Sequence, residues 1–305
     1  MKNTIYYQQA ELLLRVLPAI ATESCFALKG GTAINFFIRD LPRLSVDIDL
    51  TYLLIERREK TLFHISEAME RIGQKIQRLL PDAQIQHGRS IATSGTQKLM
   101  VKRKNVQIKI EPNEIIRGSV FPPEERVLSI KAEELFGMSI SFRTLSFADL
   151  YGGKICAALD RQHPRDLFDI KSLFDNEGIT ENVRKAFVIY LASHNRPISE
   201  LLNPQRLDIR SAYQNEFSGM AIIPVEYEFL LTARERLITD LQQNLTDSEK
   251  HFLISVKEGQ PQWDLLGIAG VDLLPAIQWK LNNIQKMNKA KHQKALDSLK
   301  EKLKI

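Results

Sequence analysis

Two aspartates, Asp47 and Asp49, stand two residues apart in an apolar stretch that covers residues 46–53. Such a stretch is typical of a β-strand, in which alternate side chains face opposite sides. The two aspartates therefore project from one face while their apolar neighbours project from the other. Carboxylates this close repel each other and raise each other's pKa. A divalent cation held between them relieves that repulsion, so the pair predicts a metal site on a strand.

A Gly-Gly turn precedes the aspartates and opens a short helix. Gly30, Gly31 and Thr32 present backbone N–H groups at the start of that helix, which is a favourable place for a phosphate. A metal pair beside a phosphate-binding turn is the working part of a site for nucleotidyl transfer. Gly-Gly and Asp-x-Asp are each common alone, and a buried strand with two chance acids is the alternative. Their order along a strand, turn, helix and second strand favours the functional interpretation.

A strand predicted over residues 106–111 supplies a third acid. Apolar residues occupy one face of this strand, and Glu111 shares the other face with Lys109. If the strand pairs beside the aspartate pair, Glu111 completes a three-carboxylate cage suited to Mg²⁺. The alternative is an exposed acid at a strand end, because a proline follows directly.

A second polar cluster lies in residues 146–175, where the pattern becomes helical. Lys154 falls on the first of two predicted helices, outside its broad apolar face. Asp166 and Asp169 fall on the second helix with i, i+3 spacing, so both can point the same way. A lysine can neutralise triphosphate charge as pyrophosphate leaves, and an acid can orient it or accept a proton from the attacking hydroxyl. The alternatives are a surface lysine and a salt bridge from Asp166 to a neighbouring arginine.

These motifs together resemble the nucleotidyltransferase superfamily of DNA polymerase β. More narrowly, they resemble the AbiEii/AbiGii (MenT-like) toxin family of type IV toxin–antitoxin systems. The superfamily signature of Gly-Gly, a spacer and Asp-x-Asp matches residues 30–31 and 47–49, and Arg-x-Ser at residues 43–45 is an addition of this branch. Residues 149–169 are similar to the family's second signature. The resemblance covers about residues 26–267.

The resemblance implies roles at both signatures. Lys154 becomes the lysine that binds the triphosphate, and Asp166 and Asp169 become acids that face the active-site cleft. Arg43 and Ser45 assist in binding the nucleotide. The predicted site residues are therefore Asp47, Asp49, Lys154, Asp166 and Asp169 for catalysis, Gly30, Gly31, Thr32, Arg43, Ser45 and Lys154 for the nucleotide, and Asp47, Asp49 and Glu111 for the metal.

The periodicity also predicts the organisation of the chain. Helices and strands are mixed up to residue 145, and the pattern from Phe147 onward is helical nearly throughout. We predict an α+β protein with a mixed-sheet nucleotidyltransferase domain at 1–145, an all-helical domain at 146–305, and the active site in the cleft between them. Strands are predicted at 25–28, 46–53, 84–87, 98–103, 106–111 and within 126–144, and helices at 3–20, 33–38, 56–80, 147–160, 165–175, 181–194, 226–244, 247–256, 271–286 and 288–303.

Composition points to an ordinary cytoplasmic protein. The 305 residues are 44% apolar and 26% charged, which is typical of soluble globular proteins. No segment approaches the roughly 18 apolar residues of a membrane span, and the first residues lack the layout of a secretory signal. Cys25 and Cys156 lie in apolar surroundings and are expected to be buried thiols in a reducing cytosol. No membrane partner is expected.

Positive charge is concentrated near the end of the sequence. The chain carries a formal charge of +5, and eight lysines but only two acids fall between Lys280 and Ile305. Two interpretations are open: a solvated terminal helix, or a surface that attracts RNA by releasing counterions. The lysines assigned to RNA binding are Lys98, Lys102, Lys104, Lys289, Lys291 and Lys294.

The resemblance implies a toxin that transfers a nucleoside monophosphate from an NTP to an acceptor and releases pyrophosphate, with Mg²⁺ or Mn²⁺ as the cofactor. The implied acceptor is the 3′ end of tRNA, and a winged-helix antitoxin is the implied partner. The alternatives are the same chemistry on a protein or a small molecule, a non-catalytic nucleotide-binding regulator, and a nucleic-acid-binding module.

Overall fold

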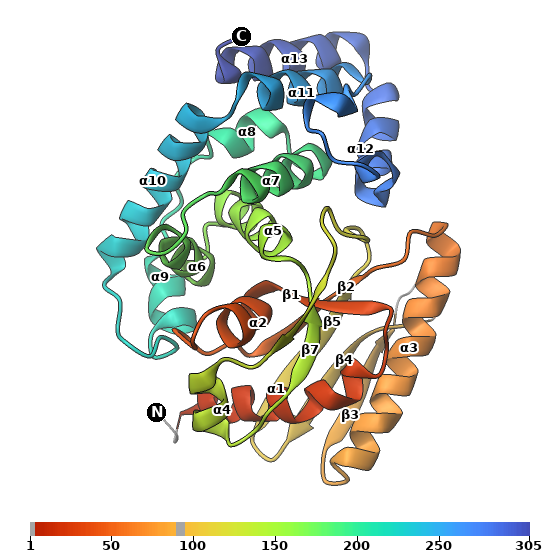
Figure 1. Cartoon of the computed structure of the whole chain (residues 1–305), viewed down its shortest axis with the longest axis vertical. Helices are drawn as coiled ribbons and strands as arrows, with labels where there is room; N and C mark the ends of the chain where they lie inside the picture. The colour runs from red at the N-terminus through yellow and green to blue at the C-terminus, as the bar shows by residue number, and fades with distance from the viewer. Residues whose placement is uncertain (1–3, 90–94) are drawn as a thin grey trace. The chain divides into compact units, whose positions relative to one another are not determined.

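The computed structural model describes residues 4–89 and 95–305; residues 1–3 and 90–94 of the first predicted domain lie outside the described residues. The chain forms two compact units (Figure 1). The sheet unit comprises residues 1–146 and 219–224, and the helical unit comprises residues 147–218 and 225–305. A mixed sheet combined with many helices confirms the predicted α+β class.

The sheet unit is built on one sheet. Its strands are β1 (Phe26–Lys29), β2 (Asp47–Tyr52), β3 (Gln84–Arg89), β4 (Thr96–Arg103), β5 (Val106–Asn113), β6 (Glu124–Val127) and β7 (Ser141–Thr144). They lie in the order β3-β4-β5-β2-β1-β7-β6. β2 pairs parallel with β5, and β1 pairs parallel with β7, whereas the other neighbours are antiparallel. The predicted aspartates are therefore carried by a central strand.

Two long helices, α1 (Ile5–Ala21) and α3 (Arg58–Leu79), pack on this sheet and on each other. α3 buries the stripe predicted for it, which includes Ile65, Met69, Ile72 and Ile76. The alternation of β2 is also as predicted, because Ile48 and Leu50 are buried. Burial of one face of the strand in the core fixes the direction in which its acids project.

A tight helical segment follows β1. α2 (Gly30–Ala33) begins at the Gly-Gly turn and continues without a break into the π-helix η1 (Ile34–Ile38). The predicted helix at 33–38 is thus confirmed, and it begins earlier than expected. The Arg39 amide donates to the Ile34 carbonyl at 2.8 Å, which is the i to i−5 bond of a π-turn. Such turns are frequent at functional sites.

One helix of the sheet unit was not predicted. Only strands were expected within residues 126–144, but α4 (Ile130–Phe136) lies between β6 and β7. Ser129 precedes α4 in extended conformation, and Gly137 ends it in the left-handed conformation. At seven residues the helix is too short to show a clear helical period against the flanking strands.

A segment from late in the sequence returns to the sheet unit. The Leu44 amide donates to the Met220 carbonyl at 2.8 Å, and the Ile222 amide donates to the Pro42 carbonyl at 2.9 Å. An antiparallel bridge joins Arg43 and Ala221. Residues 219–224 therefore hold the loop that leads into β2. No local pattern in the sequence indicates this pairing.

In the described residues of the helical unit, every regular element is helical. These elements are α5 (Phe147–Asp160), α6 (Pro164–Phe174), α7 (Glu181–Ser193), α8 (Ile198–Leu202), α9 (Arg210–Ala212), η2 (Tyr213–Phe217), α10 (Tyr227–Asn244), α11 (Asp247–Glu258), η3 (Trp263–Leu265), η4 (Val271–Leu273), α12 (Pro275–Gln285) and α13 (Lys289–Leu303). The helix predicted from residue 271 begins only at Pro275, because proline favours the first turn of a helix. Within residues 4–89 and 95–305, no helix has both the length and the apolarity to cross a membrane.

α5 and α7 form the centre of the helical unit. A Cβ atom at Gly152 of α5 would lie 2.7 Å from the backbone nitrogen of Phe187 in α7, so only glycine allows this close crossing. The capping box of α11 is present, with Thr246 accepting from the Glu249 amide and Glu249 accepting from the Thr246 amide. These contacts stabilise the helical unit that carries the polar residues of α5 and α6.

Candidate functional site

The predicted acids meet on the central strands of the sheet unit. In the parallel register of β2 and β5, Asp47 lies opposite Lys109 and Asp49 lies opposite Glu111. The predicted pairing of Glu111 beside the aspartates is therefore confirmed. All four side chains are partly exposed, in contrast to the buried residues that alternate with them. We call Asp47, Asp49, Lys109 and Glu111 the acid edge.

A lysine compensates the charge of the acid edge. Lys109 Nζ lies 2.6 Å from Glu111 Oε2. The hydrogen bond that Lys109 donates to Glu111 raises the pKa of Lys109; burial opposes that change, and the charges of Glu111, Asp47 and Asp49 add to it. An ammonium group thus lies within electrostatic reach of all three carboxylates. This arrangement offsets the repulsion among the acids.

The Gly-Gly turn lies directly against the acid edge. Gly30 has a φ of +70°, and a Cβ atom there would lie 2.7 Å from Asp49 Oδ2. A Cβ atom at Gly31 would lie 2.6 Å from Arg43 Nη2. Both positions therefore require glycine, the first for conformation and close approach and the second for close approach alone. The backbone of the turn therefore lies close to Asp49 and Arg43.

The polar residues predicted to bind the nucleotide brace this turn. The Thr32 hydroxyl forms hydrogen bonds with Ser45 Oγ at 2.9 Å and with the Asp47 carbonyl oxygen at 2.5 Å. Arg43 is 2% exposed, and its Nη1 donates to the Leu44 carbonyl at 2.9 Å. The Asn35 side chain donates to the Gly31 carbonyl at 2.9 Å. These contacts link the turn to the segment that leads into β2, and the assignment of Thr32, Arg43 and Ser45 to the nucleotide stays a prediction.

The acid edge offers the donors that a magnesium ion prefers. Among the described residues, no three His, Cys, Asp or Glu side chains form a ready-made metal cage. The three carboxylates of the acid edge nevertheless come from adjacent strands, and the absence of a side chain at Gly30 leaves room beside Asp49 Oδ2. Oxygen ligands and open space suit Mg²⁺, which retains several waters. The donor types are those that Mg²⁺ prefers, and a metal at the acid edge stays a prediction.

The helical unit contains a second cluster of charges, and it is buried. Lys154 Nζ lies 2.8 Å from Asp166 Oδ1 and 3.0 Å from Asp169 Oδ2. The Lys154 side chain is 7% exposed, and both aspartates are 0% exposed. We call these three residues the buried cluster. The i, i+3 spacing lets both acids point to one lysine, and the prediction that they face an active-site cleft stays a prediction.

Arg161 completes the charge balance of the buried cluster. Its Nε donates to Asp166 Oδ2 at 2.6 Å, and its Nη2 donates to Asp166 Oδ1 at 3.1 Å. Burial alone raises the pKa of Asp166, but the charges of Lys154 and Arg161 outweigh it and hold that pKa well below its usual range. Asp166 is therefore ionised and doubly paired.

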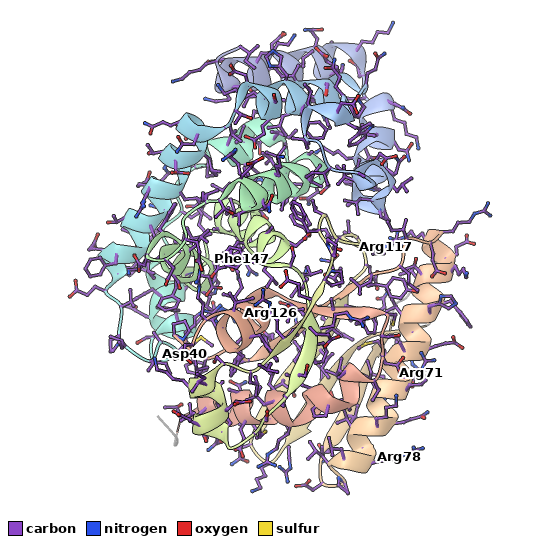
Figure 2. All side chains as sticks on the ribbon, viewed as in Figure 1. Asp40, Arg71, Arg78, Arg117, Arg126 and Phe147 are labelled. Carbon is purple, nitrogen blue, oxygen red and sulfur yellow. The ribbon has the colours of Figure 1, made fainter. Side chains whose placement is uncertain are left out.

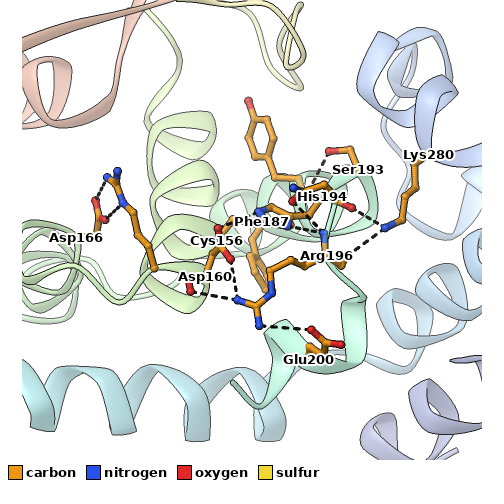
Figure 3. A network of polar contacts seen from close by, with 12 residues as sticks. Cys156, Asp160, Asp166, Phe187, Ser193, His194, Arg196, Glu200 and Lys280 are labelled. Atoms are coloured by element: carbon orange, nitrogen blue, oxygen red, sulfur yellow. Dashed lines mark hydrogen bonds and ion pairs between the residues drawn. The ribbon is translucent and has the colours of Figure 1, made fainter. Parts of the chain in front are cut away.

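Further polar contacts fix the ends of the helices that carry the buried cluster (Figure 3). Arg196 donates to Asp160 Oδ1 at 2.8 Å at the end of α5. Lys280 donates to the carbonyls of His194 and Arg196 at 2.6 and 3.2 Å. His163, for which a loop position rather than a ligand role was expected, caps α6 by accepting from the Arg165 amide. Arg196 and His163 thus hold the ends of α5 and α6, and Lys280 holds the loop after α7.

The lysines assigned to RNA binding are all exposed. Lys98, Lys102 and Lys104 belong to β4 and the following turn of the sheet unit, and Lys289, Lys291 and Lys294 belong to α13 of the helical unit. Their exposure is compatible with either interpretation of the basic segments. Their role in RNA binding stays a prediction.

Sequence reasoning missed two charged residues. Lys109 lies on the same strand face as Glu111, and this spacing was the available signal for a counter-ion. Arg161 was considered only as an alternative partner of Asp166, and the structure shows that this contact and the Lys154 contact coexist. In both places the sequence shows the charges but not how they are paired.

Comparison with known proteins finds relatives along almost the whole chain. Residues 11–283 match the family model described as the nucleotidyl transferase AbiEii toxin, type IV toxin–antitoxin system. The structure is similar to MenT4, a nucleotidyltransferase toxin from Mycobacterium tuberculosis H37Rv, with a TM-score of 0.60 and 14% identity over 97% of this chain and 95% of that chain. At this identity the likeness shows a shared fold. No curated protein sequence matches.

Proposed function

This chain belongs to the AbiEii family of nucleotidyltransferase toxins, as its motifs predicted, and on that premise we propose that it transfers a nucleoside monophosphate from an NTP to the 3′ end of a tRNA. Pyrophosphate is the second product. The new phosphodiester forms at the acceptor hydroxyl, the bond between the α- and β-phosphates breaks, and the hydroxyl proton passes to a base.

One observation carries the proposal. The register places Asp49 opposite Glu111, and Gly30 leaves space at Asp49 Oδ2 where any other residue would place a Cβ atom. Carboxylates beside a glycine turn that opens a helix provide a place for a metal-bound triphosphate.

Each residue of the acid edge then has a role. Asp47, Asp49 and Glu111 would hold Mg²⁺ or Mn²⁺, which supplies positive charge to the phosphates when bound. Gly30 and Gly31 would present backbone amides to the triphosphate. Thr32, Arg43 and Ser45 hold the turn beside the segment that leads into β2. They would bind the nucleotide or position the backbone amides that do.

Lys154, Asp166 and Asp169 keep the roles that the family implies for them. Lys154 would neutralise triphosphate charge, and one of the aspartates would orient it or accept the acceptor's proton. The short contacts within the buried cluster support the orienting role, because both carboxylates bind the lysine directly.

The acceptor and the partner follow from the family. The exposed lysines of β4 and α13 are compatible with contacts to tRNA phosphates. A cognate antitoxin with a winged-helix fold is the proposed partner, and the cytoplasm is the proposed location.

The decisive experiment is an assay with each labelled NTP on total tRNA, run in parallel on wild type and Asp47→Asn. We expect label to accumulate on tRNA with the wild type and to be lost with the variant. Total protein and small-molecule extracts serve as parallel acceptors. Label on protein or on a small molecule alone would reject the RNA acceptor, and equal labelling by Asp47→Asn would reject catalysis at the acid edge.

A further inference from the structure

Arg117 of the sheet unit is a buried cation that lacks an acidic partner in the described residues. The residue is 7% exposed. Neither Nε nor Nη1 of its guanidinium has a hydrogen-bond partner among residues 4–89 and 95–305. Buried arginines are normally paired, because an uncompensated buried charge loses hydration without return. A guanidinium held in this state is ready for an anion that is not part of the chain.

A carboxylate at the end of β2, where Arg117 lies, is already engaged. The amide of Gly118, next to Arg117, donates to the Tyr52 carbonyl at 2.8 Å, so Arg117 lies beside the end of β2. Glu56 follows four residues later, but it accepts from the Tyr52 hydroxyl at 2.8 Å and pairs with Lys60 and His64 at 2.9 Å. Glu56 is thus saturated by other donors.

The charge next to Arg117 is positive. Burial lowers the pKa of Arg117, and the charge of Arg58 lowers it further, while Tyr52 acts in the opposite direction. Arg58 is exposed, and its Nη1 donates to the Glu114 carbonyl at 3.5 Å. The Glu114 carboxylate lies within electrostatic reach of Arg58 but forms no ion pair with Arg117. Two neighbouring guanidinium groups are typical of a phosphate site.

The first turn of α3 adds backbone donors. α3 has 22 residues and begins at Arg58, and the side chain of its N-cap residue, Arg57, makes no capping hydrogen bond. The unpaired N–H groups and the dipole of such a helix favour an anion at its N-terminus. Figure 2 labels Arg117 near the end at which α3 begins, with Arg71 and Arg78 farther along the helix.

We propose that Arg117, Arg58 and the first turn of α3 form a phosphate site that holds a backbone phosphodiester of the nucleic-acid acceptor. This proposal rests on the proposed function, because it assumes a nucleic-acid acceptor.

The distance from the acid edge separates this phosphate from the reacting triphosphate. Tyr52 follows Asp49 by three residues on β2, which corresponds to roughly 10 Å along a strand. The triphosphate must lie at the carboxylates themselves. A phosphate at Arg117 therefore belongs to another part of the substrate, and a backbone phosphate of the acceptor strand is at a suitable spacing.

Apolar side chains around the site suit unpaired bases. Ile55, Phe63 and Ile115 are 48%, 60% and 57% exposed. Ile55 and Ile115 follow the ends of the paired strands β2 and β5, and Phe63 lies on α3 little more than one turn after Arg58. Cationic groups for the backbone beside exposed apolar and aromatic groups for the bases are the usual features of single-strand binding.

The test measures binding without catalysis. A short labelled single-stranded RNA is titrated in EDTA, without NTP, against wild type, Arg117→Met and Arg78→Met. Arg78 lies in the last turn of α3, so the control removes the same charge from the opposite end of that helix. We expect Arg117→Met to weaken binding about tenfold and to reduce the salt slope by about 1. Arg78→Met should bind RNA as the wild type does.

Two further measurements exclude a merely structural arginine. The thermal midpoint of Arg117→Met should equal or exceed that of the wild type, because an uncompensated buried charge is removed. Inorganic phosphate should raise the midpoint of the wild type more than that of Arg117→Met. Phe63→Ala should weaken RNA binding but leave the response to phosphate unchanged.

The proposal is overturned if Arg117→Met binds RNA as the wild type does, or if its thermal midpoint falls. If Arg117→Met weakened NTP binding but left RNA binding unchanged, the site would bind the triphosphate, and the proposed contact with the acceptor would be rejected. These outcomes are independent of the proposed function, since RNA binding in EDTA can persist even if no nucleotide is transferred, and transfer can occur without Arg117.

Discussion

The acid edge and the buried cluster both place a lysine among aspartates or glutamates, but they differ in exposure. In the acid edge, Lys109 is 35% exposed and its partner Glu111 is 42% exposed. In the buried cluster, Lys154 is 7% exposed, and Asp166 and Asp169 are fully buried. The same kinds of residue are therefore available to a ligand in one unit and enclosed in the other.

This difference in exposure predicts different effects on stability. Exposed ion pairs contribute little to stability and can be exchanged for a ligand at low cost. Buried pairs are strongly coupled, because removing one partner leaves an uncompensated charge in the interior. We therefore expect changes in the acid edge to act on activity, and changes in the buried cluster to act first on the stability of the helical unit.

The largest effect is expected from Lys154→Met. Two buried carboxylates lose a common partner, and the helical unit should lose about 3–5 kcal/mol of unfolding free energy. Trp263 and Trp279, the two tryptophans of the chain, both lie in this unit, so urea unfolding followed by their fluorescence measures it directly. The control is Lys185→Met, which removes an i, i+4 pair with Glu181 on α7. Similar losses of unfolding free energy in both variants would contradict the distinction between buried and exposed ion pairs.

The next effect is expected from Asp47→Asn. The rate of nucleotidyl transfer should fall by more than about a hundredfold, since mutating a residue that only hydrogen-bonds to a metal ligand already lowers metal affinity or activity by roughly 10–100-fold. Unfolding should be unchanged or slightly harder, because repulsion with Asp49 decreases. Asp82→Asn, at an exposed pair with Arg103, should change neither quantity. A clear loss of stability in Asp47→Asn would make the acid edge a structural element.

A smaller effect separates backbone strain from crowding at the acid edge. Gly30 and Gly137 have φ values of +70° and +64°, but only at Gly30 would a Cβ atom meet another group, Asp49 Oδ2 at 2.7 Å. Each change to alanine should cost roughly 1–2 kcal/mol of stability. Only Gly30→Ala should lower transfer, by about tenfold, in a side-by-side assay. Equal activity in the two variants would remove Gly30 from the site.

The smallest effect concerns acid stability. The folded-state pKa of Asp166 lies below its unfolded value near 3.8, so its stabilisation is present above that value and is lost as the pH falls. Arg161→Met raises the folded-state pKa, so its stabilisation should be smaller by about 1 kcal/mol at neutral pH and should disappear at less acidic pH. Tryptophan fluorescence against pH measures both. Superimposable acid transitions of wild type and variant would show that Lys154 alone sets the pKa.

Sequence patterns predict most elements of this fold, because the faces of its strands and helices are strongly apolar. The helices at 147–160 and 181–194 and the strand of Asp47 and Asp49 lie within a few residues of their predicted limits. The motif spacing also identified the family, since a glycine turn followed by paired acids is a local pattern. Local order and local chemistry are what a single sequence displays.

Non-local pairing accounts for what was not predicted. The alternation of β5 shows that Lys109 and Glu111 share a face, but only the register shows that they lie opposite Asp47 and Asp49. The state of Arg117 depends on residues from β2 and α3 that are far away in the sequence. Likewise, no pattern near Met220 indicates that it pairs with the loop before β2.

The returning segment has a consequence for synthesis of the protein on the ribosome. The sheet strands and the glycine turn emerge early, but the carbonyl of Met220 and the amide of Ile222 are added only after residues 147–218 of the helical unit have been translated. Domains usually fold as their residues emerge. Until then, the loop around Arg43 lacks its backbone hydrogen bonds to Met220 and Ile222. The sheet unit therefore reaches its final form only late in translation.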